Sequence, residues 1–145
     1  MKRITLLCCA ALLVGCAPAD EEAAMETATI SLADVAGMWQ AQALPETGDS
    51  ALVTYEMVAT ESTEGWTVTF PGRAPLPARV VAVEGDSIVV EVGPYESLLR
   101  DGLMVSTRTV ARLQNNILVG TFVAHYEAAG ADSVLRGRLR GMRVE

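Results

Sequence analysis

From about residue 31 onward, apolar and polar residues alternate in short segments rich in Val, Thr and aromatic side chains. A period of two is typical of β-strands that bury one face, and turn residues such as Gly, Pro, Asn and Asp separate the segments. The pattern predicts eight strands: Met38–Leu44, Leu52–Thr60, Trp66–Phe70, Ala78–Glu84, Ser87–Val92, Met104–Leu113, Ile117–Glu127 and Ser133–Arg143.

The connections between these segments are mostly short. Glu84-Gly85-Asp86 and Gln114-Asn115-Asn116 predict tight hairpins, whereas the segment Pro71–Pro77 is too rich in proline for a central strand. The one long loop is Gly93–Gly102, in which Tyr95–Arg100 could form one helical turn ended by Gly102.

Short connections imply antiparallel neighbours, and an open sheet of eight strands would expose two edges. Closing the sheet removes both edges. The fold class is therefore predicted to be all-β, a small eight-stranded antiparallel meander barrel over residues 31–145. A two-sheet β-sandwich is the alternative. Ser31-Leu32-Ala33-Asp34 has the form of a capping box, and the helix that it starts must be very short because Gly37 follows.

Alternation also assigns the two faces of each strand. In the last strand Arg136, Arg138 and Arg140 point one way, and we expect that way to be outward. The side chains expected to line the interior and to contact a ligand are Trp66, Phe70, Thr107, Thr109, Phe122 and Tyr126. Several inward positions carry small or polar residues, so the interior either holds one small ligand or is fully packed.

The N-terminus has the features of an export signal. Lys2 and Arg3 precede an apolar run of about 11 residues, which is too short for the roughly 20 of a membrane-spanning helix. The run ends in Leu13-Val14-Gly15-Cys16, which resembles the lipobox of bacterial lipoproteins. The resemblance implies a signal peptide over residues 1–15 and acyl chains, palmitate among them, on Cys16. A cleaved signal peptide with a chance cysteine is the alternative.

Residues 16–30 are small and acidic, and we interpret them as a flexible stalk between the lipid and the barrel. In the lipoprotein resemblance, Ala17 in place of Asp implies the outer membrane, facing the periplasm. After cleavage, nine arginines and 18 acidic residues remain, a net charge of −9. That charge argues against nucleic acid as a partner.

A second resemblance concerns the barrel. Gly37-Met38-Trp39, at the entry to the first strand, is similar to the Gly-x-Trp motif of lipocalins and the wider calycin group. The resemblance implies that an arginine near the last strand packs over the tryptophan, and Arg140 and Arg143 are the candidates. It also implies a cavity for a small apolar or amphipathic ligand.

Catalytic chemistry is not indicated by any motif. His125 is the only histidine and falls on the outward face, and the sequence carries no zinc-ligand spacing, nucleophile elbow or dinucleotide fingerprint. We therefore expect that the protein is not an enzyme and that it binds neither a cofactor nor a metal ion.

Two functions follow as hypotheses. The first is a tethered binding module that holds or passes a small apolar molecule. The second is a structural or assembly module of the envelope, which would engage a protein or anionic partner through Arg136, Arg138 and Arg140, with Arg108 and Arg112 two strands away. Cross-strand ion pairs that merely keep the surface soluble are the simpler explanation of these arginines.

Overall fold

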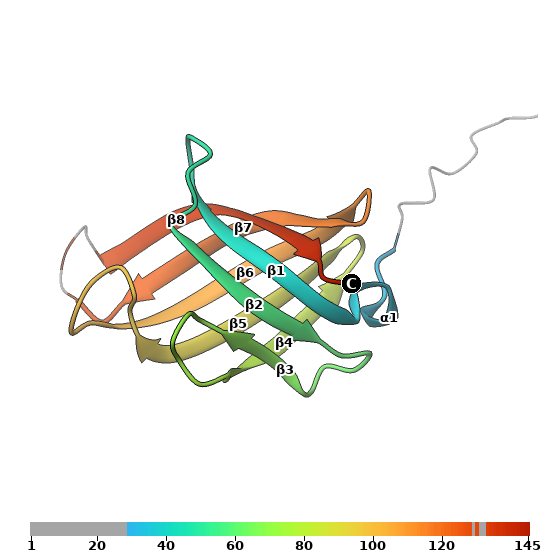
Figure 1. The fold of residues 1–145 in the computed structure, drawn as a ribbon, viewed down its shortest axis with the longest axis horizontal. Coiled ribbons are helices and arrows are strands. Elements are labelled where there is room, and N and C mark those ends of the chain that lie inside the picture. Colours follow the sequence, from blue (N-terminus) through green and yellow to red (C-terminus); the bar gives the residue numbers. More distant parts are fainter. Residues whose placement is uncertain (1–28, 129, 131–132) are drawn as a thin grey trace, which may run out of the picture.

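The computed structural model describes residues 29–128, 130 and 133–145. A short helix, α1, precedes eight antiparallel strands that pair in chain order and close into a barrel (Figure 1). The elements are α1 (Leu32–Val35), β1 (Gly37–Pro45), β2 (Val53–Ala59), β3 (Trp66–Thr69), β4 (Leu76–Glu84), β5 (Ser87–Glu96), β6 (Met104–Gln114), β7 (Ile117–Tyr126) and β8 (Val134–Arg143). The predicted meander barrel is confirmed, and the sandwich alternative is wrong.

The predicted signal peptide, the lipidated Cys16 and stalk residues 16–28 lie outside the described residues. Ile30, which we placed at the end of the stalk, packs against the core and donates its backbone N–H to Gly85 O at 2.9 Å. Within the described residues, no helix is long and apolar enough to cross a membrane.

The ladders between neighbouring strands differ in length. β1 and β8 close the barrel over seven residue pairs, from Trp39↔Arg143 to Pro45↔Gly137. β6 and β7 pair over ten residues. In contrast, β3 makes only three pairs with β2 and three with β4. The wall of the barrel is therefore least continuous at β3.

The two tight hairpins form as predicted. Asn115 and Asn116 both have positive φ angles, of 50° and 62°, which is the conformation that a two-residue turn of the I′ type requires. Asn tolerates this region better than other residues with a side chain, so the local sequence selects the turn.

The region of residues 71–102 differs from the prediction in two ways. β4 begins at Leu76 and includes Pro77, which we assigned to a loop. Proline is tolerated there because it is the second residue of a strand whose ladder with β3 is short. β5 continues to Glu96 through an irregularity between Val92 and Tyr95, so the predicted helical turn at Tyr95–Arg100 is wrong.

Glycines let the strands bend where the barrel is tightest. A Cβ on Gly137 would lie 2.5 Å from the ring of Phe122 and would also collide with Leu44 O. On β7, a Cβ on Gly120 would collide with Val110 O. Glycine at such positions gives the strong curvature that a small closed barrel needs.

Candidate functional site

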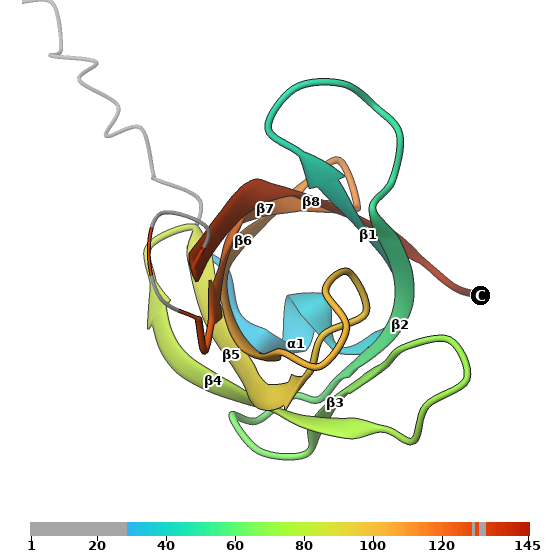
Figure 2. The same cartoon turned by 90° about the vertical axis from the view of Figure 1, so that its left-hand side faces the viewer.

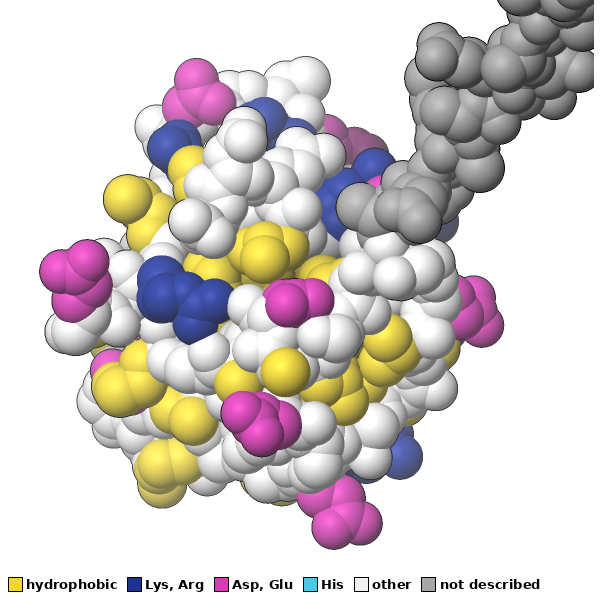
Figure 3. All heavy atoms as spheres, turned by 90° about the vertical axis from the view of Figure 1, so that its right-hand side faces the viewer, with side chains coloured by type: hydrophobic (Ala, Val, Ile, Leu, Met, Phe, Trp, Pro, Cys, Tyr) yellow, Lys and Arg dark blue, Asp and Glu magenta, His cyan; other side chains and the backbone are white. Residues whose placement is uncertain are grey.

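One end of the barrel is closed by α1. The Ser31 side chain accepts from Asp34 N, and the Asp34 carboxylate accepts from Ser31 N at 2.9 Å, so the predicted capping box is present. Val35 is fully buried beneath the strands. Figure 3 views this end, where apolar side chains are interspersed with acidic and basic ones.

Trp39 is the centre of the closed end. Its side chain is fully buried, and its Nε1–H donates to Val35 O at 2.8 Å. The guanidinium carbon of Arg143 lies 4.3 Å from the centroid of the Trp39 ring. Arg143 also donates to Ala36 O at 2.5 Å and to Asp34 O at 2.8 Å, which are carbonyls at the end of α1. Arg143 thus joins the last strand to the helix across the tryptophan.

Of the two arginines proposed for this role, only Arg143 fills it. Arg140 is exposed on the outer face and pairs by register with Gln42. Strand alternation explains the difference, because Arg143 has the same parity as the interior Leu139 and Gly141. Arg140 has the opposite parity, that of the outward-facing Arg136 and Arg138, so strand alternation alone distinguishes it from Arg143.

The interior of the barrel contains a cavity of about 90 Å³. Side chains from α1 and from every strand except β4 line it, and none of them is charged. The lining includes all six residues predicted from the sequence: Trp66, Phe70, Thr107, Thr109, Phe122 and Tyr126. Trp39 is not among the lining residues, because it lies below the cavity at the closed end.

The size of the cavity limits what fits without movement. An apolar cavity of ~150 Å³ holds a benzene-sized guest, so about 90 Å³ suits a smaller group or a segment of a thin chain. Threonines 107 and 109 face the cavity yet are only half-buried, so their side chains border empty space. The interior is therefore not fully packed.

Opposite α1, a loop of residues 97–103 extends across the mouth of the barrel (Figure 2). Ser97 is buried, and its hydroxyl accepts from Leu99 N at 3.0 Å and Arg100 N at 3.1 Å, which fixes the first turn of the loop. Leu98 and Leu99 line the cavity at the mouth of the barrel. No sequence pattern indicated that this loop covers the mouth.

Two arginines hold the loop in place. The guanidinium carbon of Arg100 lies 4.2 Å from the ring centroid of Tyr126. Arg73, from the β3–β4 loop, donates to the carbonyl oxygens of Glu96 and Ser97 at the base of the loop. The mouth is thus partly covered by a segment with defined contacts.

A cluster of three aromatic side chains, Tyr55, Phe70 and Tyr95, lines one side of the cavity. The ring of Phe70 is 5.4 Å from that of Tyr55 and 5.1 Å from that of Tyr95. Burial raises the pKa of Tyr55 and of Tyr95 above the ordinary value of 10.0. Both hydroxyls therefore stay neutral at physiological pH, and the cavity wall carries no charge there.

A separate groove of about 550 Å³ lies outside β1, β2 and β3. Polar and apolar residues both line it, and two of its lining residues, Tyr55 and Phe70, also line the interior cavity. No sequence pattern predicted this groove, because it depends on how far β3 pairs with β2.

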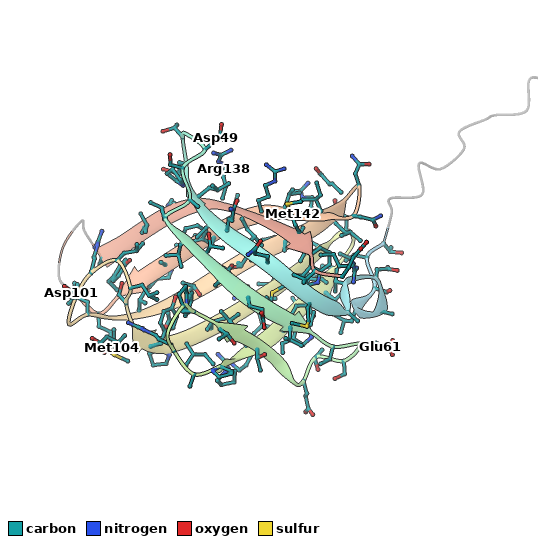
Figure 4. The ribbon with its side chains drawn as sticks, in the orientation of Figure 1. Asp49, Glu61, Asp101, Met104, Arg138 and Met142 are labelled. Atoms are coloured by element: carbon teal, nitrogen blue, oxygen red, sulfur yellow. The ribbon has the colours of Figure 1, made fainter. Side chains whose placement is uncertain are left out.

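In β8, Arg136, Arg138 and Arg140 point outward as predicted. Arg138 is bound to the β1–β2 loop: its Nε–H donates to Pro45 O at 3.1 Å, it also donates to Gly48 O, and it lies 3.6 Å from an Asp49 carboxylate oxygen (Figure 4). Arg138 is therefore engaged by the β1–β2 loop, whereas the cross-strand ion pair of the simpler explanation is found at Arg108, which faces Glu91 by register.

Strand register places the remaining arginines in two rows across β6, β7 and β8. The rows are Arg108, Val123, Arg136 and Arg112, Val119, Arg140. Arg108 pairs with Glu91 at 2.5 Å, and Arg112 lies 3.8 Å from Asp86. Among the residues that the structure describes, Arg136 and Arg140 have no ion pair.

The described residues contain no group of three or more His, Cys, Asp and Glu that is arranged to hold a metal ion. His125 is exposed on the outer face of β7, where it pairs by register with Ser106 and Val134. Comparison of the chain with protein-family models, with curated proteins and with solved structures finds no match. What the chain shows by itself is a small, closed, eight-stranded antiparallel β-barrel.

Proposed function

We propose that this protein is a lipid-tethered envelope protein whose barrel holds a small apolar molecule or the chain of a thin amphiphile. One observation carries the proposal: the interior has an uncharged cavity of about 90 Å³, bordered by half-buried threonines and aromatic rings. An interior evolved only for stability would fill such space, because empty volume lowers the free energy of unfolding by ~24 cal/mol per Å³.

The architecture supports the same proposal. The closed end, with Gly37, Trp39 and Arg143 in contact, is similar to the base of lipocalin barrels, and the covered mouth lies at the opposite end. The interior offers an apolar guest a surface without charge, so binding gains from the burial of apolar area at about 25 cal/mol per Å². The role needs no catalytic residue, and we propose none.

The two tryptophans provide a direct test. Trp66 lines the cavity and Trp39 does not, although both are buried. Titration with 1-decanol should quench the fluorescence of a Trp39→Phe variant, in which Trp66 is the reporter. The matched Trp66→Phe variant, in which Trp39 is the reporter, should change little. Equal responses in the two variants, or none in either, would contradict the proposal.

The tether is proposed from the motif Leu13-Val14-Gly15-Cys16. Ile30 lies at the α1 end of the barrel, so the proposed stalk would join the barrel at the end opposite the mouth. Radiolabelled palmitate should be incorporated into the full chain, with fractionation to the outer membrane. A Cys16→Ser variant should lose both, and labelling that survives this change would refute the anchor.

An assembly role is the second candidate, favoured by Arg136 and Arg140. Both are exposed and lack an ion pair within the described residues, on a chain with a net charge of −7. We expect in-cell crosslinking from position 140 to capture an acidic partner, and capture should fall when both arginines are replaced by Gln. A crosslinking pattern unchanged by these replacements would exclude this face as the contact.

A further inference from the structure

The barrel wall is incomplete between β2 and β3. Only Glu56, Met57 and Val58 of β2 pair with β3. The preceding residues Val53–Tyr55 pair with β1 but have no partner on the other side among the described strands. The β3–β4 loop, which would have to continue the wall, bows outward from the barrel (Figure 2).

Two aromatic side chains fill this discontinuity. Tyr55 and Phe70 are the residues shared by the linings of the interior cavity and the outer groove. Their rings are 5.4 Å apart and tilted by 58°. A side-chain layer without a backbone ladder can open by rotamer changes, which cost far less than the breaking of strand hydrogen bonds. The cavity and the groove are therefore separated by the part of the wall that is easiest to move.

The groove outside this point differs in chemistry from the cavity inside. Its polar lining consists of Gln40, Thr54, Glu56, Thr69 and Arg73. Glu56 is exposed and has no ion pair within the described residues, whereas the Arg73 guanidinium is already engaged by the carbonyls of Glu96 and Ser97. The groove thus offers hydrogen-bonding groups and two opposite charges, the Glu56 carboxylate and the Arg73 guanidinium. These charges offset each other, so the groove favours an uncharged, hydrogen-bonding head group over a charged one.

We propose that the groove outside β1, β2 and β3 holds the uncharged, hydroxyl-bearing head of a single-chain amphiphile, whose chain enters the cavity sideways between Tyr55 and Phe70. The proposal rests on the function proposed above, because it requires an interior that accepts an apolar chain. It adds a position for the head group and a route that bypasses the loop of residues 97–103.

Head-group selectivity tests the position of the head. Binding is followed by Trp66 fluorescence in the Trp39→Phe background, with monodecanoylglycerol and decanoate as probes that share one chain. The glycerol ester should bind more tightly than decanoate at neutral pH. Glu56→Lys should raise the affinity for decanoate about ten-fold, because it replaces a repelling charge beside the head with an attracting one.

Glu61→Lys is the matched control. Glu61 is also exposed but lies in the β2–β3 loop at the α1 end, outside the groove (Figure 4). Its replacement gives the same change in net charge and should alter decanoate affinity less than about two-fold. Equal effects of the two lysines would overturn the head-group position while leaving the interior site intact. Quenching of Trp66 by neither probe would overturn the interior site, and this inference with it.

Binding kinetics test the route. Phe70→Leu trims the layer between cavity and groove, whereas Leu99→Ala trims the loop over the mouth. Both changes enlarge the cavity lining, so the two variants are compared with each other. Stopped-flow measurements with monodecanoylglycerol should show association and dissociation both about three-fold or more faster in Phe70→Leu than in Leu99→Ala. Faster exchange in Leu99→Ala alone would place the entrance at the mouth and refute the sideways route.

Discussion

Arg143 lies over the indole ring of Trp39, with its guanidinium carbon 4.3 Å from the ring centroid. The two residues are also direct partners in the β1–β8 ladder that closes the barrel. The contact therefore joins three features: the closure of the sheet, the end of α1 and the floor of the interior.

Removal of either partner should destabilise the barrel by different amounts. Trp39→Ala leaves a large cavity in the floor and should cost roughly 3–5 kcal/mol. Arg143→Met loses the ring contact and two hydrogen bonds, and should cost about 1–2 kcal/mol. Urea unfolding measures both. Arg140→Met, three residues away on the outer face, is the control and should stay within about 0.5 kcal/mol of wild type; an effect equal to that of Arg143→Met would refute the contact's role.

Gly137 should be the least replaceable glycine of β8. A Cβ there would collide with Leu44 O and lie 2.5 Å from the Phe122 ring, so Gly137→Ala should cost about 1–3 kcal/mol through overpacking. Gly141→Ala is the control on the same strand and the same side, where the nearest atom is Leu118 Cβ at 3.2 Å. In thermal unfolding, the midpoint temperature of Gly137→Ala should be well below that of Gly141→Ala. The reverse order would show that the strand does not bend at residue 137.

The capping box predicts a dependence of stability on pH. Hydrogen bonds from the backbone and side chain of Ser31 lower the pKa of Asp34 below its ordinary value of 3.8. The folded state therefore binds this proton less readily than the unfolded state. The stabilisation is present in full above pH 3.8 and is lost as the pH falls through the lowered pKa of the folded state.

Asp34→Asn should accordingly unfold at a lower temperature than wild type near neutral pH, and the difference should shrink as the pH falls to about 2.5. Asp101→Asn makes the same charge change on the loop at the other end and serves as the reference. A difference between wild type and Asp34→Asn that stays constant with pH would argue against the capping box as its source.

The sequence was sufficient for the architecture because the strands carry their own boundaries. Alternation identified all eight, and Asn115-Asn116 and Gly85-Asp86 specified the turns that force antiparallel order. The same alternation placed Arg136, Arg138 and Arg140 outside and the six lining residues inside.

The errors occurred where local sequence and tertiary context disagree. Pro77 favours a loop, yet it lies in β4, where it is the second residue of the strand and has no register partner on β5. Gly93-Pro94 looks like the start of a loop, yet β5 continues past it and places Tyr95 beside Phe70. The outer groove was not predictable, since it depends on how far β2 and β3 pair, which no local sequence pattern specifies.

The central claim, that the interior is a binding site, is tested most directly by filling it. Thr109 lines the cavity, and Thr121 lies on the outer face of the neighbouring strand. Titration of 1-decanol, followed by Trp66 fluorescence in the Trp39→Phe background, compares Thr109→Phe with Thr121→Phe. If the interior is the binding site, Thr109→Phe should weaken binding at least about ten-fold, whereas Thr121→Phe should leave it unchanged. Equal affinities in these two variants would contradict it.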